Sequence, residues 1–112
     1  MARVVAFVPD LLFGSKVQGM LAAAGHEVDL VSTSDAARER VSGASVVVVD
    51  LTAGDPDVAG IVGAVPSLAF YSHVDAEVRA RAEQAGYDLV VPRSRMAREM
   101  PELVARLLSD LT

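Results

Sequence analysis

The segment Ser45–Leu51, with the sequence SVVVVDL, constrains the fold of this chain more than any other segment. Four successive valines favour an extended strand, and an apolar run without polar alternation is typical of a strand buried on both faces. Such strands lie at the centre of parallel sheets that helices cover on both sides. Asp50 ends the valine run, and the carboxyl ends of parallel strands line the crevice where open α/β sheets bind ligands. The segment therefore predicts a central strand that carries an acid into this crevice.

Other apolar runs alternate with helical patterns along the whole chain. Strands are expected over 4–8, 27–31, 67–71 and 89–91, and helices over about 15–24, 34–41, 58–65, 75–85 and 101–111. Short βα connections require right-handed crossovers and parallel strands. The polar second strand and the short fifth strand suit sheet edges. Residues 1–112 are thus predicted to form one α/β domain, a flavodoxin-like (βα)5 doubly wound parallel sheet with strand order 2-1-3-4-5.

Three residues mark the expected starts of these helices. Ser34 or Asp35 is expected to cap the second helix. Pro101 is expected in the first turn of the last helix, where a missing backbone N–H is tolerated. These positions define the expected starts of the second and the last helix.

Composition excludes several classes of function. A net charge of −5 argues against non-specific nucleic-acid binding, because no basic stripe would neutralise phosphates. The chain contains no cysteine, so disulfides, thiolate metal sites and cysteine nucleophiles are excluded. The apolar runs are too short for a membrane span, and the apolar start of the chain is too short for a secretory leader. We therefore expect a cytoplasmic protein that binds neither nucleic acid nor membranes.

Three segments carry a family resemblance. They are SVVVVD over 45–50, SLAFYS over 67–72 and GYDLVVPR over 86–93. In this order and spacing they resemble the response-regulator receiver domain, the phosphoacceptor module of two-component signalling and phosphorelays. The resemblance covers nearly the whole chain. It implies that Asp50 is the phosphoacceptor, that Ser72 is the switch hydroxyl, and that Arg93 stands where the family has lysine.

The sequence also departs from the receiver pattern. Receivers hold Mg²⁺ with two adjacent acids after the first strand together with the phosphoacceptor, whereas here the segment VPD over 8–10 leaves only Asp10. The planar guanidinium of Arg93 does not replace a compact ammonium group. His73 would crowd the site, and Val90 stands where receivers have a switch aromatic. The resemblance therefore implies an atypical or degenerate member, in which Asp10 and Asp50 bind Mg²⁺ weakly and no other cofactor is expected.

Several acids also have purely structural interpretations. Asp50 could accept backbone hydrogen bonds from the loop that follows it, and Asp10 could cap the first helix. Asp55, Asp57 and Asp75 fit turn and cap positions. The sequence leaves the choice between these roles and the functional ones open.

Three hypotheses about function remain. The first is a stand-alone, receiver-like signalling or interaction domain, poor at Mg²⁺-dependent aspartyl phosphorylation, that binds a histidine kinase or another signalling protein. It could also form a homodimer through the fourth helix, fifth strand and last helix, where charged residues gather: Arg79, Arg81, Arg95, Arg98, Glu99, Glu102 and Arg106. The second is an unconventional receiver that is still phosphorylated on Asp50.

The third hypothesis is a small-ligand binder or enzyme that uses the crevice at the strand ends. Its candidate residues are Asp10, Ser15, Lys16, Asp50, Ser72 and Arg93. Ser72 and His73 are not expected to form a nucleophile–base pair, because adjacent strand residues face opposite sides. Gly14, Ser15 and Lys16 suggest phosphate binding, but the upstream glycine of a P-loop is missing. No catalytic constellation is visible, so enzymatic activity is left open.

Overall fold

The computed structural model describes residues 2–51, 63, 65–71 and 76–109. In chain order its elements are β1 (Arg3–Phe7), α1 (Leu11–Ala23), β2 (Glu27–Val31), α2 (Ser34–Val41), β3 (Val46–Asp50), β4 (Ser67–Tyr71), α3 (Ala76–Ala85), β5 (Leu89–Pro92) and α4 (Arg93–Ser109). Most of the helix expected over 58–65, and the expected cap Asp75, lie outside these residues. Among the described residues, no helix is both long and apolar enough to cross a membrane.

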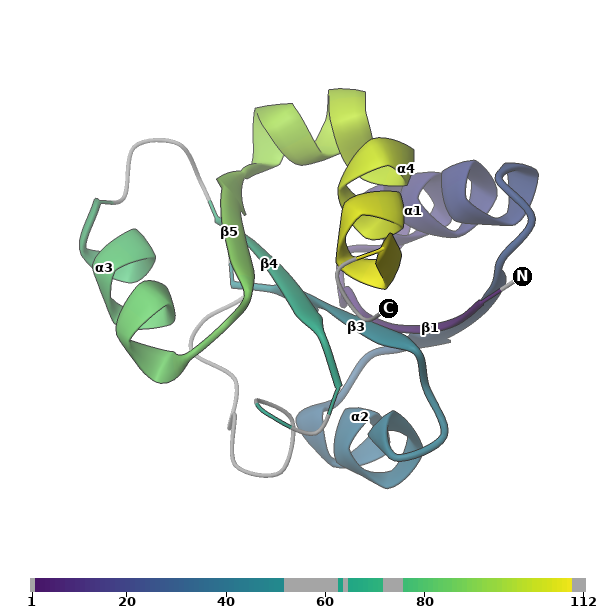
Figure 1. The fold of residues 1–112 in the computed structure, drawn as a ribbon, viewed down its shortest axis with the longest axis horizontal. Helices are drawn as coiled ribbons and strands as arrows, with labels where there is room; N and C mark the ends of the chain where they lie inside the picture. The colour runs from purple at the N-terminus through teal and green to yellow at the C-terminus, as the bar shows by residue number, and fades with distance from the viewer. Residues whose placement is uncertain (1, 52–62, 64, 72–75, 110–112) are drawn as a thin grey trace.

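The five strands form one parallel sheet in the order β2-β1-β3-β4-β5 (Figure 1). Both edge strands are partly exposed, whereas β3 and β4 are buried along their whole length. This arrangement confirms the predicted α/β class, the flavodoxin-like topology and the assignment of the second and fifth strands to the edges.

The valines of β3 face two separate hydrophobic layers. Val46 and Val48 pack in the cluster formed with α1 and α4, while Val47 and Val49 pack in the cluster formed with α2 and α3. Successive side chains of a strand point to opposite faces, so a strand between two helical layers must be apolar at every position. The double-sided burial explains why this strand is a continuous valine run.

The first two helices differ from the expectation at their amino ends. The first was expected from about Ser15, but α1 begins directly after Asp10, because the Asp10 carboxylate caps its first amides. The second was expected to be capped by Ser34 or Asp35. Its N-cap is instead Thr33, whose hydroxyl accepts a backbone hydrogen bond at 3.1 Å. Ser34 and Asp35 lie inside the helix, in its first turn, where the negative charge of Asp35 interacts favourably with the positive end of the helix dipole.

The last helix differs most from the expectation. It was expected to start near Pro101, but α4 begins at Arg93 and contains Pro101 in its interior. An interior proline removes one backbone hydrogen bond and bends a helix, and the ribbon of α4 changes direction along its length (Figure 1). Met96 and Met100 are fully buried one turn apart against the sheet. Burial of these two side chains stabilises the additional turns that precede the proline.

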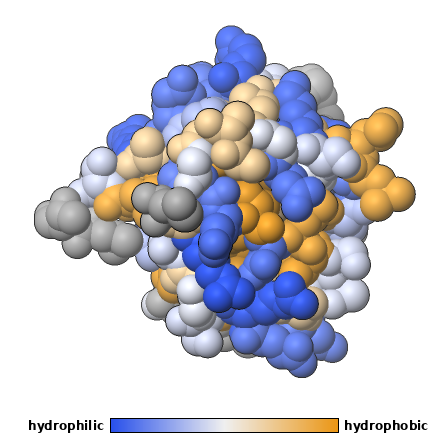
Figure 2. Space-filling model, turned by 90° about the vertical axis from the view of Figure 1, so that its right-hand side faces the viewer, coloured by the Kyte–Doolittle hydropathy of each residue, from blue (hydrophilic) through white to orange (hydrophobic). Residues whose placement is uncertain are grey.

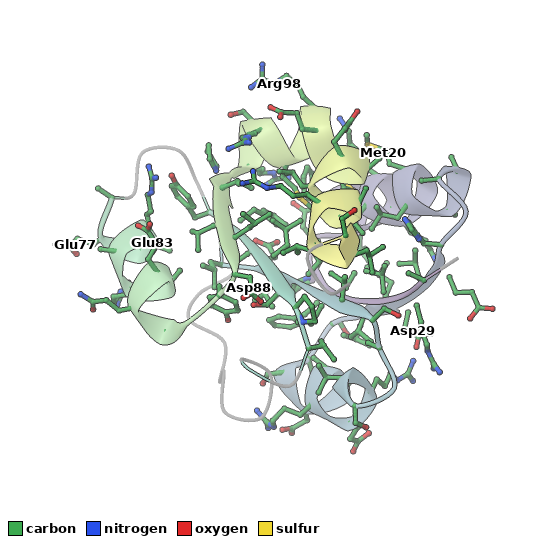
Figure 3. All side chains as sticks on the ribbon, in the orientation of Figure 1. Met20, Asp29, Glu77, Glu83, Asp88 and Arg98 are labelled. Carbon is green, nitrogen blue, oxygen red and sulfur yellow. The ribbon has the colours of Figure 1, made fainter. Side chains whose placement is uncertain are left out.

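A hydrogen-bonded pair joins the amino ends of β4 and β5. The carboxylate of Asp88 accepts a hydrogen bond from the Ser67 amide at 2.8 Å. In return, the hydroxyl of Ser67, which is fully buried, accepts one from the Asp88 amide at 3.1 Å. Figure 3 shows Asp88 beside these strands, at the side of the sheet facing α3. Asp88, which lies in the GYDLVVPR segment, thus satisfies buried polar groups.

Candidate functional site

Asp10 lies at the carboxyl end of β1 and starts α1. One carboxylate oxygen, Oδ1, accepts hydrogen bonds from the backbone amides of Leu12 at 3.0 Å and Phe13 at 3.1 Å. The Phe13 amide is the largest influence on this group and, with Arg93 and the Leu12 amide, holds the pKa of Asp10 below its ordinary value despite partial desolvation. Asp10 is therefore an ionised helix cap, which confirms the structural interpretation of this residue.

Arg93 reaches Asp10 from the end of β5, the edge strand on the other side of β3 and β4. Arg93 follows β5, and its Nη2 lies 3.2 Å from Asp10 Oδ2 in an ion pair. In the sheet, β3 and β4 lie between β5 and β1, so this ion pair links two strand ends that are not neighbours. The side chains are 39% and 41% exposed, so the pair lies at the protein surface.

Two aromatic rings lie beneath this ion pair. The guanidinium carbon of Arg93 lies 4.3 Å from the centre of the Phe13 ring, within the range of a cation–π contact. The Phe13 ring in turn packs on Phe70 of β4, with centroids 5.0 Å apart and planes tilted by 53°. Such a tilted arrangement is favourable for aromatic pairs. Arg93, Phe13 and Phe70 thus form a stack that links α4, α1 and β4.

The sequence pattern did not identify Phe13 or Phe70 as site residues. Phe13 lies three residues after Asp10, in a helical turn that was expected to be a loop. A correct start for α1 would have placed Phe13 in the first turn, next to the crevice. Phe70 was recognised only as part of a strand, because its partner is distant in sequence.

Asp50 is the last residue of β3 and is only 1% exposed. The alternation along β3 places its side chain on the same face as Val46 and Val48, which is the side of α1 and α4. Its register partner in β4 is Phe70, a member of the aromatic stack. Asp50 therefore lies at the predicted crevice, but with almost no accessible surface.

The remaining candidates are not brought into this cluster by any described contact. Ser15 and Lys16 are exposed on α1. The first free amides of that helix, where an anion could bind, already bond to Asp10. Ser72 and His73 lie outside the described residues. Of the sequence-predicted set, the structure therefore brings Asp10 and Arg93 into contact and places Asp50 on the same side of the sheet.

Asp10, one of the two expected Mg²⁺ ligands, already has partners for both of its carboxylate oxygens. Mg²⁺ requires near-octahedral oxygen ligation, usually with one or two carboxylates. Asp10 uses Oδ1 for two amides and Oδ2 for Arg93, so a metal ion would have to displace a guanidinium of like charge. Within the described ranges, no group of three or more His, Cys, Asp or Glu residues could hold a metal ion.

The fold and the position of Asp50 define the class of structure. The chain has the fold of response-regulator receiver domains, with a carboxylate at the end of the central strand. No protein-family model matches the sequence, and no curated protein sequence matches it. The comparison therefore depends on structure.

Solved structures of receiver domains superpose over nearly the whole chain. A response regulator receiver protein from Burkholderia phymatum is 22% identical, with a TM-score of 0.78 and coverage of 97% of this chain and 96% of that chain. A response regulator receiver domain protein from Clostridium thermocellum is 14% identical, with a TM-score of 0.81 and coverage of 98% and 96%. At these identities the likeness establishes the fold.

A third similar structure comes from a protein family with another role. It belongs to a family of redox sensors in the streptococci, described as evolved from two-component response regulators. It is 10% identical, with a TM-score of 0.81, and the match covers 98% of this chain and 52% of that chain. The same fold is thus found in a protein described as a redox sensor.

Proposed function

We propose that this chain is an atypical receiver-like signalling domain that acts by binding a protein partner and is poor at Mg²⁺-dependent phosphorylation of Asp50. The observation that carries the proposal is the Asp10–Arg93 ion pair at 3.2 Å. A receiver would use an acid at this position, after the first strand, to bind a metal ion. Here the guanidinium of Arg93 neutralises that acid, and Phe13 holds the guanidinium in place.

The burial of Asp50 supports the same proposal. A phosphoryl group adds bulk and negative charge, and a side chain that is 1% exposed offers almost no surface to a donor. Transfer to Asp50 would require neighbouring groups to move and a cation to neutralise the product. Arg93, the cation expected to take this role, is already paired with Asp10.

A phosphoryl-analogue titration tests the proposal directly. We expect beryllofluoride with low-millimolar Mg²⁺ to change the amide NMR spectrum little in the wild type, and no more than in Asp50→Asn. The matched gain-of-function variant combines Pro9→Asp with Arg93→Lys, which supplies adjacent acids and a compact ammonium group. This variant should show saturable shifts that disappear when Asp50→Asn is added.

Two outcomes would contradict this reasoning. Saturable, Asp50-dependent shifts in the wild type would establish the alternative, an unconventional receiver phosphorylated on Asp50. A folded but unresponsive Pro9→Asp/Arg93→Lys variant would show that the missing acid and the arginine are not the cause of the weak chemistry. Phosphotransfer from a histidine kinase provides an independent check on the wild type.

The surface formed by α3, β5 and α4 is our proposed partner-binding face. Its charges are mixed and form local pairs, with Arg79 and Glu83 3.4 Å apart and Arg95 and Glu99 3.4 Å apart. Arg98 points away from the sheet at the outer side of α4 (Figure 3). Exposed pairs of this kind add little stability but provide electrostatic complementarity for a partner. Charge reversal at Arg98 should weaken binding to a cognate histidine kinase or to another signalling protein, and an unchanged affinity would exclude this face.

A further inference from the structure

The outward face of α1 differs from the rest of the described surface. The 13 residues of the helix, LLFGSKVQGMLAA, include one charged residue, Lys16, and no acid. Leu11 and Leu12 are 84% and 87% exposed and are the exposed large hydrophobic residues among those described. Figure 2 shows strongly apolar residues projecting at one edge of a surface that is otherwise a mixture of polar and apolar residues. Exposed apolar groups that lie together indicate an interaction site.

Gly19 gives a second, independent indication. A glycine inside a helix destabilises it by about 1 kcal/mol relative to alanine. A Cβ added at Gly14 of the same helix would lie 3.2 Å from the Val8 carbonyl oxygen, so packing within the chain requires that glycine. A Cβ added at Gly19 would meet nothing within 4 Å. The fold of one chain therefore gives no reason for a glycine at position 19.

The small residues of this face lie along one line. Ser15, Gly19 and Ala22 are exposed and follow the i, i+4, i+7 spacing that places helical residues on one side. Leu11 and Leu12 lie at the amino end of this line, and Ala22 and Ala23 lie at its carboxyl end. The face therefore has bulky residues at one end and small residues along the rest of its line, with the exposed Lys16 and Gln18 on its two sides. Small residues along such a line allow another helix to approach closely.

We infer that α1 pairs with α1 of a second copy of this chain, with the two helices antiparallel about a two-fold axis. In this arrangement Leu11 and Leu12 of each copy cover Ala22 and Ala23 of the other, and Ser15 lies opposite Gly19. A two-fold interface must be complementary to itself, and the sorting of large and small residues along α1 has this property only when the second helix is reversed.

Charge opposes the pairing of two copies less at this face than at the other described helices. Each chain carries a net charge of −5, so two copies repel each other through most surfaces. The other described helices each contain acidic side chains, whereas α1 contains none. Lys16 lies at the side of the small-residue line, where its long side chain can reach solvent. The contact is small, so the dimer is expected to be weak.

Sedimentation velocity over a range of concentrations tests the pairing. The wild type should show a reversible monomer–dimer equilibrium below about 1 mM, and Leu12→Gln should weaken it by at least about tenfold. Gly19→Leu should abolish the dimer while the chain stays folded, because the position is open in the monomer. Ala80→Leu, at an exposed position of α3, is the matched control and should leave the dimer unchanged.

Single-cysteine variants test the orientation, since the natural chain has no cysteine. A mixture of Leu12→Cys and Ala22→Cys chains, carrying tags of different mass, should form mainly mixed cross-links with a short bismaleimide. Adding Gly19→Leu to both should suppress them. A wild type that stays monomeric to about 1 mM, or a dimer unaffected by Gly19→Leu, would overturn the inference. Predominant Leu12→Cys homodimers would overturn the antiparallel arrangement.

Discussion

Gly14 and Gly19 lie on the same helix, yet substitution of each by alanine should have a different effect on stability. Gly19 is open, so Gly19→Ala should stabilise the folded monomer by about 1 kcal/mol, the usual difference in helix propensity. Gly14→Ala gains the same propensity. Its new Cβ, however, would lie 3.2 Å from the Val8 carbonyl oxygen and 3.3 Å from a methyl carbon of Leu30.

The difference between the two variants isolates the packing effect, because the propensity gain is common to both. Val8 O is a backbone atom in the connection between β1 and α1, so it can move only if the helix moves with it. Overpacking of this kind typically destabilises by about 1–3 kcal/mol. Gly14→Ala should therefore be less stable than Gly19→Ala by about 1–3 kcal/mol.

Urea denaturation measures this difference when it is followed by far-ultraviolet circular dichroism at low micromolar concentration. At this concentration self-association through α1 contributes nothing. Equal m-values for the two variants would show that the midpoints report stability. If Gly14→Ala and Gly19→Ala were equally stable, the close approach of α1 to β1 and β2 would be wrong. If Gly19→Ala were destabilising, Gly19 would have a role within one chain and the argument for α1 pairing would lose its second support.

Three further predictions concern the site and the sheet. Because the folded-state pKa of Asp10 is lowered, this group stabilises the fold above its unfolded pKa of about 3.9 and the effect is lost as pH falls through the folded value. Asp10→Asn keeps a capping oxygen, so its stability deficit in urea should shrink below about pH 4 and vanish in stronger acid; a deficit independent of pH would contradict the assignment. For Arg93 and Phe13, a double-mutant cycle with Arg93→Lys and Phe13→Leu should give a coupling of about 0.5–1 kcal/mol, and zero coupling would exclude the stack. Asp88→Ala should cost about 1–3 kcal/mol by leaving the buried polar groups of Ser67 without this acceptor, whereas Ser67→Ala/Asp88→Ala should cost less than the sum of the two single variants.

The ion pair gives this crevice a different electrostatic character from that of a metal site. A bound divalent cation would bring two positive charges. These exceed the single negative charge of one carboxylate, so the remaining positive charge could attract a phosphoryl group. The Arg93 guanidinium brings one positive charge, and Asp10 neutralises it at 3.2 Å. The Asp10–Arg93 pair is therefore close to neutral before any ligand arrives. This property explains why we place partner binding, rather than phosphoryl chemistry, at the centre of the proposed function.

Local sequence patterns determined the fold class of this protein. The period of two in strands and of about 3.6 in helices depends on near neighbours, so the strands and the burial of β3 could be predicted from residue order alone. Gly25 and Gly86 follow α1 and α3, and both adopt positive φ, at 93° and 99°, which glycine tolerates without strain. Strand order followed from connection rules and from the polarity of the edge strands.

Tertiary packing decided the site. The contact between Asp10 and Arg93 joins residues 83 positions apart, and no local pattern specifies such a distance. The start of α4 was also beyond the sequence signal. Pro101 disfavours an interior helical position, but burial of Met96 and Met100 against the sheet outweighs that local preference. Because α4 begins at Arg93, this side chain reaches Phe13 and Asp10. Asp50 at the end of β3 was thus visible in the sequence. The pairing of Arg93 with Asp10, in contrast, depends on how α1 and α4 pack together.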